Sequence, residues 1–148
     1  MVDIDTKIVE EIVRRVLKEQ LDANNDFKKE TDKSGVAVIK TSTVKPEKFD
    51  TGKEGDKVYL KDVLNLEESP RLGCGVMEME ESTFDWTLKY DEVDYIIDGT
   101  LEIVIGDRKI VGNKGDIIFI PKDTAIKFSC PQHARFVYVV YPANWEAL

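Results

Sequence analysis

The sequence has little of several residue types on which common functional sites depend. It holds one histidine, His133, so a metal site built on several histidines of one chain is excluded. Its two cysteines, Cys74 and Cys130, do not make a disulfide framework, and we expect both as reduced thiols. Bases are also too few, because 21 Lys and Arg against 29 Asp and Glu leave a net charge of −8. That balance argues against a nucleic-acid partner.

Long hydrophobic runs are missing as well. No apolar run reaches the roughly 20 residues that a membrane-spanning helix needs. The acidic N-terminal stretch lacks an apolar segment followed by a small-residue cleavage site, so we expect no secretory signal and a cytoplasmic protein without a membrane partner. The chain of 148 residues, 42% of them hydrophobic, is long enough for one domain with one core.

The first part of the chain, 1–22, predicts an amphipathic helix that Asp5 or Thr6 can cap. Three- and four-residue spacing places its apolar residues on one face: Ile8, Val9, Ile12, Val13, Val16, Leu17 and Leu21. The polar stretch 23–56 predicts a linker with a possible edge strand near Val36. The apolar face favours an external partner, and packing on the protein's own barrel or on a second copy is the alternative.

From residue 57 to residue 148 the pattern is typical of many short strands without helices, which indicates an all-β sandwich or barrel. Asp98-Gly99 and Gly106-Asp107 each predict a hairpin turn between β-rich segments. The segment 130–135 predicts a turn that separates a strand at 125–129 from one at 135–141. Phe119, Phe128, Phe136, Tyr138 and Tyr141 are expected to fill the barrel, whereas Trp86 and Trp145 could border a pocket or a dimer interface.

Two motifs in this region resemble those of the cupin fold, a small double-stranded β-helix or jelly-roll barrel. The first is Glu92, six residues and Gly99, and the second is Gly115-Asp116, a strand and Pro121. The histidines that cupins usually place around a metal are missing, because the matching positions fall within 85–88 and at Ile126. Glu92 alone remains of that set, so we expect no transition metal in the usual cupin site.

A closer resemblance is to the EutQ family of ethanolamine-utilisation proteins. It rests on FDWTLKYDEVDYIIDGTLEIVIGDRKI, on GDIIFIPKDTAIKFSCP and on ARFVYVVYPANW. The helix at 8–21 is similar to the peptides that target enzymes into bacterial microcompartments. The resemblance implies a homodimer in such a compartment, with the helix docked on shell or cargo proteins. It also implies acetate kinase activity with ATP and Mg²⁺, although the chain has no Gly-x-x-x-x-Gly-Lys phosphate loop.

The candidate site is the inward face around Glu92 and Asp94, which alternation places on one side of a strand. We expect Glu92, Asp94 and Tyr90 as catalytic residues and Asp85 and Thr87 as substrate-binding residues. The carboxylates could hold Mg²⁺, or one of them could have a raised pKa and act as an acid or base. Alternatively, both carboxylates only bond neighbouring side chains at the barrel mouth.

Two other functions remain open from the sequence. The chain could be a non-catalytic scaffold, adaptor or metabolite-binding cupin, which the missing metal histidines and nucleotide motif favour. An epimerase-like cupin would need a histidine inside the barrel, and His133 is poorly placed for that role. An open acidic pocket would favour catalysis or ligand binding, and a packed interior would favour the scaffold.

Overall fold

The computed structural model describes residues 5–23 and 26–148, without the side chains of 18–23. The expectations for residues 1–4 of the helical segment and for the side chain of Leu21 therefore lie outside the described part. The chain divides into two compact units, Met1–Lys45 and Pro46–Leu148.

The first unit contains the expected helix and a small hairpin. Helix α1 spans Thr6–Ala23, and the Lys7 N–H donates to the Asp5 carboxylate at 2.9 Å, so Asp5 caps it. No helix within 5–23 or 26–148 is long and apolar enough to cross a membrane. Strand β1, Lys29–Thr31, pairs antiparallel with β2, Ala37–Ile39, and η1 follows at Thr41–Thr43. The expected strand near Val36 thus pairs within the segment expected as a linker, not at the barrel edge.

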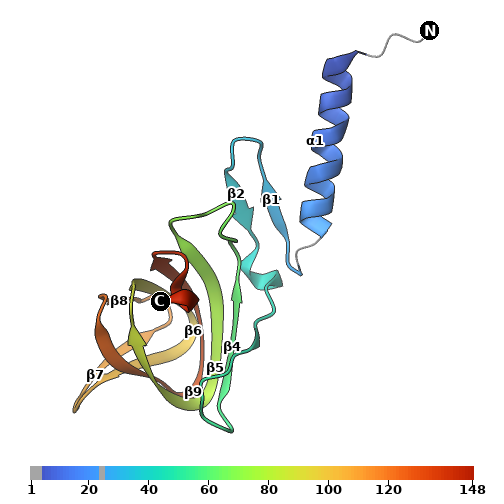
Figure 1. The fold of residues 1–148 in the computed structure, drawn as a ribbon. Helices are drawn as coiled ribbons and strands as arrows, with labels where there is room; N and C mark the ends of the chain where they lie inside the picture. Colours follow the sequence, from blue (N-terminus) through green and yellow to red (C-terminus); the bar gives the residue numbers. More distant parts are fainter. Residues whose placement is uncertain (1–4, 24–25) are drawn as a thin grey trace. The chain divides into compact units, whose positions relative to one another are not determined.

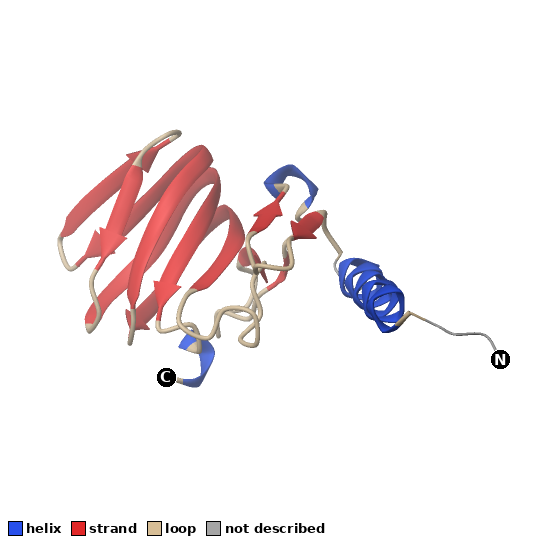
Figure 2. Ribbon diagram, turned by 90° about the horizontal axis from the view of Figure 1, so that it is seen from above, coloured by secondary structure: helices blue, strands red, loops and turns tan. Residues whose placement is uncertain are grey.

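The second unit is an antiparallel barrel, shown by the green-to-red strands of Figure 1 and by the curved red strands of Figure 2. Its sheet runs in the order β3-β4-β5-β9-β6-β7, and β8 pairs with β6. The bounds are β3 Glu47–Lys48, β4 Lys57–Asp62, β5 Gly73–Leu88, β6 Asp91–Ile105, β7 Arg108–Asn113, β8 Ile117–Ile120 and β9 Thr124–Tyr141, with η2 at Trp145–Ala147. The all-β barrel with an N-terminal amphipathic helix is confirmed.

Two turns that the sequence predicts do not form, because a long strand runs through each of the two segments. Strand β6 runs through Asp98-Gly99, and Gly99 pairs with Ala134 of β9, which runs through 130–135 without a turn. Gly99 lies at an irregularity in the β6–β9 register, with φ of 77°. A Cβ there would lie 2.1 Å from the His133 carbonyl oxygen. Asp98-Gly99 therefore allows close contact between two strands, whereas the Gly106-Asp107 hairpin is confirmed.

Side-chain alternation divides the aromatic residues between the core and the surface. Phe128, Phe136 and Tyr138 are buried as expected. Phe119 and Tyr141 are 62% and 55% exposed, so the expectation that they fill the barrel is wrong. They belong to an exposed apolar strip on the outer face of β6, β8 and β9, composed of Val93, Tyr95, Ile117, Phe119 and Tyr141.

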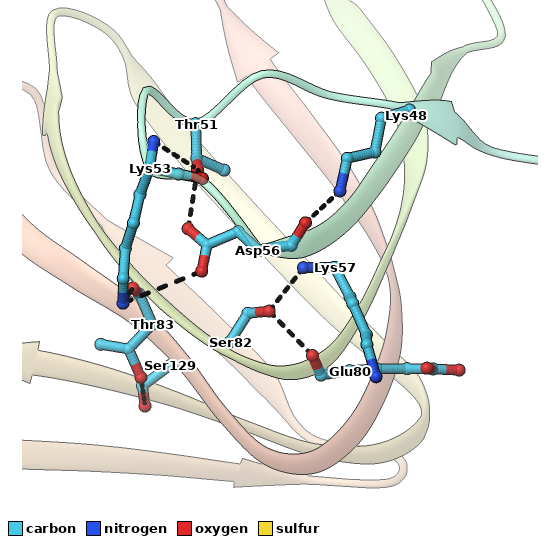
Figure 3. A network of polar contacts seen from close by, with 9 residues as sticks. All are labelled: Lys48, Thr51, Lys53, Asp56, Lys57, Glu80, Ser82, Thr83 and Ser129. Carbon is cyan, nitrogen blue, oxygen red and sulfur yellow. Dashed lines mark hydrogen bonds and ion pairs between the residues drawn. The ribbon is translucent and has the colours of Figure 1, made fainter.

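A network of polar contacts fixes the loop between β3 and β4 (Figure 3). The buried Asp56 carboxylate accepts a hydrogen bond from Thr51 at 2.7 Å and lies 3.8 Å from the Lys53 ammonium. The Lys48 ammonium donates to the Asp56 carbonyl, and the Lys57 N–H donates to Ser82 at 2.7 Å. Ser82 follows the β5 bulge, so its hydroxyl joins the loop to the point where the ladder is interrupted. Lys48 and Lys53 thus have structural partners.

Replacing Gly99 with alanine is expected to destabilise the barrel more than the same change at another glycine of positive φ. Gly99→Ala adds a Cβ against the β9 backbone and should lower the free energy of unfolding by more than about 2 kcal/mol. Gly106→Ala, at φ of 63° with nothing within 4 Å, should cost only about 1 kcal/mol. Equilibrium urea unfolding measures both, and equal losses would contradict the continuous β6–β9 contact.

Candidate functional site

The site is formed where β5 ends and β6 begins. Strand β5 ends at Leu88 and β6 begins at Asp91, so two residues, Lys89 and Tyr90, connect them. In the first six residues of β6 the buried positions are Glu92, Asp94 and Ile96, because successive side chains alternate between the two faces of a strand. The inward direction expected for Glu92 and Asp94 is confirmed. Their catalytic role stays a prediction.

Asp85 and Thr87 do not join this group. On β5 the side chains of Phe84 and Leu88 are buried and that of Trp86 is half-buried, whereas Asp85 and Thr87 are exposed. The Asp85 carboxylate is 84% exposed and lies 4.0 Å from the Lys127 ammonium on the outer surface. The expectation that Asp85 and Thr87 face the interior is therefore wrong. The sequence left the length of the β5–β6 connection open, and that length decides which β5 residues face inward.

The barrel interior holds a small pocket with aromatic walls. Its cavity of about 30 Å³ has room for roughly two or three water molecules. Trp86 donates its indole N–H to the Tyr90 hydroxyl at 2.7 Å, and Tyr138 donates its O–H to Asp62. The lining residues are Phe49, Leu60, Met77, Phe84, Trp86, Tyr90, Glu92, Phe128, Tyr138, Val140 and Trp145. Among the described residues, the lining contains no lysine or arginine.

Glu92 and Asp94 form a buried carboxyl pair. Their side chains are 5% and 0% exposed, and no N–H or O–H group in the described part of the chain donates to either Asp94 carboxylate oxygen. Burial, followed by the charge of Glu92, raises the pKa of Asp94 well above its usual value. Burial also raises the pKa of Glu92, to about 7. The interaction within the pair raises the pKa of Asp94 further and lowers that of Glu92, so Asp94 is the member that keeps its proton.

The two pocket tyrosines stay protonated beside these carboxyls. Burial, followed by the charge of Glu92, raises the pKa of the Tyr90 hydroxyl. Burial and the neighbouring Asp62 carboxylate raise the pKa of Tyr138. Because the Tyr90 oxygen accepts from Trp86 and the Tyr138 proton is donated to Asp62, Tyr90 can still donate its O–H into the pocket.

The pair does not fit a resident Mg²⁺ ion. Mg²⁺ requires six oxygen ligands and keeps several waters, whereas Asp94 is fully buried and the cavity admits only a few waters. No group of three or more His, Cys, Asp or Glu residues within 5–23 and 26–148 could hold a metal ion. At the positions of the usual cupin histidines, Leu88 and Ile126 are buried and Trp86 lines the pocket.

Sequence reasoning missed part of the pocket wall. Phe49 precedes residue 57, where we expected the barrel to begin, and it follows the two-residue strand β3. Asp62 gave no sequence signal, because it contributes through a hydrogen bond to Tyr138, 76 positions later. Tyr138 was expected inside the barrel, and alternation along 135–141 places it inward with Phe136 and Val140. Gly75 makes room for it, since a Cβ there would lie 2.1 Å from the Tyr138 hydroxyl oxygen.

The raised pKa of Glu92 predicts that folding stability falls as the pH rises. Between pH 4.5, its usual pKa, and about 7, the unfolded chain releases the Glu92 proton while the folded chain keeps it. This group's stabilising contribution is complete below pH 4.5 and is lost as the pH rises through 7, by up to about 3 kcal/mol. Urea unfolding of Glu92→Gln between pH 4 and pH 8 should show a smaller loss than the wild type.

Glu54→Gln, which removes an exposed carboxylate, is the matched control for that profile. Its pH dependence should follow that of the wild type. If Glu92→Gln also follows the wild type, Glu92 is not held protonated by burial.

Comparisons with known proteins agree with the cupin fold. The structure of the Clostridium difficile EutQ protein has a TM-score of 0.82 and 56% sequence identity, covering 84% of this chain and 93% of that chain. The Schizosaccharomyces pombe Cnp3 cupin domain has a TM-score of 0.57 at 13% identity, covering 75% of this chain and 80% of that one. At that identity the likeness shows the fold alone, and with it the expected cupin barrel is confirmed.

Curated relatives and a family model agree on the family. A protein named acetate kinase EutQ from Clostridioides difficile strain 630 is 52% identical over 98% of this chain and 96% of its own length. One of the same name from Escherichia coli K12 is 34% identical over 95% of this chain, but the chain spans only 62% of that relative. The family model described as ethanolamine utilisation protein EutQ matches residues 4–147. This chain therefore belongs to the EutQ family of ethanolamine utilisation proteins, as its motifs indicate.

Proposed function

We propose that this chain is an acetate kinase of ethanolamine utilisation, which takes acetate in the barrel pocket and ATP, as its Mg²⁺ complex, at the pocket mouth. The observation that carries the proposal is the relative named acetate kinase EutQ, 52% identical along nearly the whole of both chains. The cavity of about 30 Å³ admits only a few heavy atoms and is far too small for a nucleotide. ATP would therefore remain outside the pocket.

In this reaction an acetate oxygen attacks the γ-phosphorus of ATP. The bond from that phosphorus to the bridging oxygen breaks, ADP leaves with the bridging oxygen, and acetyl phosphate forms. Acetate is already deprotonated at neutral pH, so the step needs no general base. The chain's own groups act instead as proton-holding donors. Tyr90, and Glu92 while it is protonated, would orient acetate by donating to the oxygen that does not attack.

A non-catalytic, metabolite-binding cupin is the second candidate. The lining described above offers no lysine or arginine to a phosphate, although phosphoryl transfer depends on positive charge around the transferred group. A protein of this kind would bind a small molecule in the pocket and transfer nothing.

Removing the Tyr90 hydroxyl tests the location of the site. Tyr90→Phe keeps the buried ring and removes a donor, so kcat/KM for acetate should fall roughly tenfold while the barrel stays folded. Tyr95→Phe, on the exposed strip of the same strand, is the matched control and should match the wild type. The assay follows acetyl phosphate formation from acetate and Mg²⁺–ATP.

Each other outcome of this assay is informative. If the wild type transfers no phosphoryl group, the kinase is excluded under those conditions and the metabolite-binding cupin is favoured. If transfer proceeds and Tyr90→Phe equals the wild type, the acetate site lies outside the pocket.

We further propose that helix α1 docks this protein on shell or cargo proteins of a microcompartment. The described apolar side chains of this helix are 43–55% exposed: Ile8, Val9, Ile12, Val13, Val16 and Leu17. They form one face, as an amphipathic helix that docks in a groove of a partner requires. The expected homodimer has a separate surface, the apolar strip on β6, β8 and β9, which a second copy would cover.

Charges on the apolar face of α1 should abolish docking without harming the barrel. Ile12→Glu with Val16→Glu should eliminate co-sedimentation with purified microcompartment shells, because the face would no longer bury apolar area. The free energy of unfolding of the barrel should change by less than about 1 kcal/mol. Arg14→Glu, on the opposite helix face, is the control and should still co-sediment. Retained docking of the double variant would contradict this use of the helix.

A further inference from the structure

The wall of the barrel pocket is a cluster of aromatic rings around Trp145. The Trp145 ring centroid lies 6.1–6.4 Å from those of Tyr90, Trp86, Phe49 and Tyr138. Trp86 lies on β5, Tyr138 on β9 and Trp145 in η2. Phe49 follows β3 and Tyr90 connects β5 to β6, and all five rings line the same cavity. Aromatic faces carry negative electrostatic potential, so a group of rings around one small space attracts a cation.

The ionisable side chains that accompany these rings carry negative charge or none. Glu92 lines the cavity, and Asp94 lies two residues further along the same face of β6. No lysine or arginine among the described residues lines the cavity to neutralise them. Once Glu92 is ionised, above its pKa of about 7, these surroundings favour a positively charged occupant, because opposite charges attract more strongly in a partly buried site than in bulk water.

The hydrogen-bonding groups of the pocket also favour a cation. Two of its donors are already used, the Trp86 N–H on Tyr90 and the Tyr138 O–H on Asp62. An ammonium group brings three N–H donors and no acceptor. It would donate to Glu92, the carboxyl group that lines the cavity.

The size of the cavity limits what is attached to the ammonium group. Space of about 30 Å³ holds roughly two or three waters, so it admits only a few heavy atoms, such as the ammonium nitrogen and the carbon atoms next to it. Nucleotides, peptides and amino acids with long side chains are too large.

We propose that the aromatic pocket binds a small organic ammonium cation, a primary amine on a two-carbon stem, with its nitrogen against Glu92 and its carbon atoms among the rings of Trp86, Tyr90 and Trp145. The site is the same pocket to which the proposed function assigns acetate. Only the expected competition between the amine and acetate rests on that proposed function. Because the pocket holds one such molecule at a time, the amine competes with acetate.

Binding can be measured on the full chain by intrinsic fluorescence. Both tryptophans of the sequence, Trp86 and Trp145, line the cavity, so an occupant changes their emission. The probe is ethanolammonium chloride at pH 8, where an aliphatic amine is protonated and Glu92 is above its pKa of about 7. Ethylene glycol is the neutral control of the same size, and sodium chloride controls for ionic strength.

We expect saturable binding of ethanolammonium with a Kd of about 1 mM or below, and at least tenfold weaker binding of ethylene glycol. Absence of saturation by about 100 mM, or equal binding of ethylene glycol, would overturn the inference. This comparison uses the wild type and is independent of how any variant folds.

A pair of variants tests whether the ammonium nitrogen contacts Glu92. Glu92→Gln removes the charge at nearly constant size and should weaken ethanolammonium binding at least tenfold in calorimetric titration, whereas Glu54→Gln should not change it. Unchanged affinity of Glu92→Gln would contradict the contact.

The outcome is separable from that of the kinase proposal. Amine binding by a protein that transfers no phosphoryl group would leave this inference standing and remove the kinase. Phosphoryl transfer without amine binding would do the reverse. If both occur, ethanolammonium should raise the apparent KM for acetate without changing kcat.

Discussion

The structure depends most on the burial of two carboxyl groups at successive inward positions of one strand. Glu92 and Asp94 are 5% and 0% exposed, in a barrel whose other inward side chains are nearly all apolar or aromatic. Two carboxylates cannot both ionise in such surroundings without a large cost, so the pair keeps at least one proton at neutral pH. This requirement explains why Mg²⁺ fits poorly between the two groups.

The long strands place the Glu92–Asp94 pair beside the aromatic wall of the pocket. Strand β6 pairs with β9 along almost its whole length and contributes Glu92 and Asp94 from its first residues. The same β9 pairs with β5, so Trp86 and Tyr138 face a common interior. Gly99 allows β6 to approach the β9 backbone at its irregular point. The site therefore follows from the closure of the barrel and does not rest on one loop.

Much of the fold and half of the site could be predicted from the sequence, for identifiable physical reasons. Alternation gave the inward direction of Glu92 and Asp94, and apolar spacing gave helix α1. Asp85 and Thr87 were misplaced because a two-residue connection, which spacing alone does not reveal, sets which β5 residues face inward. Asp98-Gly99 resembles a hairpin turn, yet the same glycine serves a close strand contact, and only tertiary pairing distinguishes the two. Phe49 and Asp62 reach the site through contacts distant in sequence, which local patterns do not carry.

The central claim is that Glu92 and Asp94 share a proton at neutral pH, and the titration of their carboxyl carbons tests it most directly. Side-chain ¹³C-labelled protein followed by NMR from pH 3 to pH 9, with Glu92→Gln and Asp94→Asn for assignment, resolves each group. The account predicts one carboxyl that titrates near pH 7 and a second that stays protonated well above pH 4. Two carboxyls that both titrate near pH 4, as they do in unfolded chains, would contradict it.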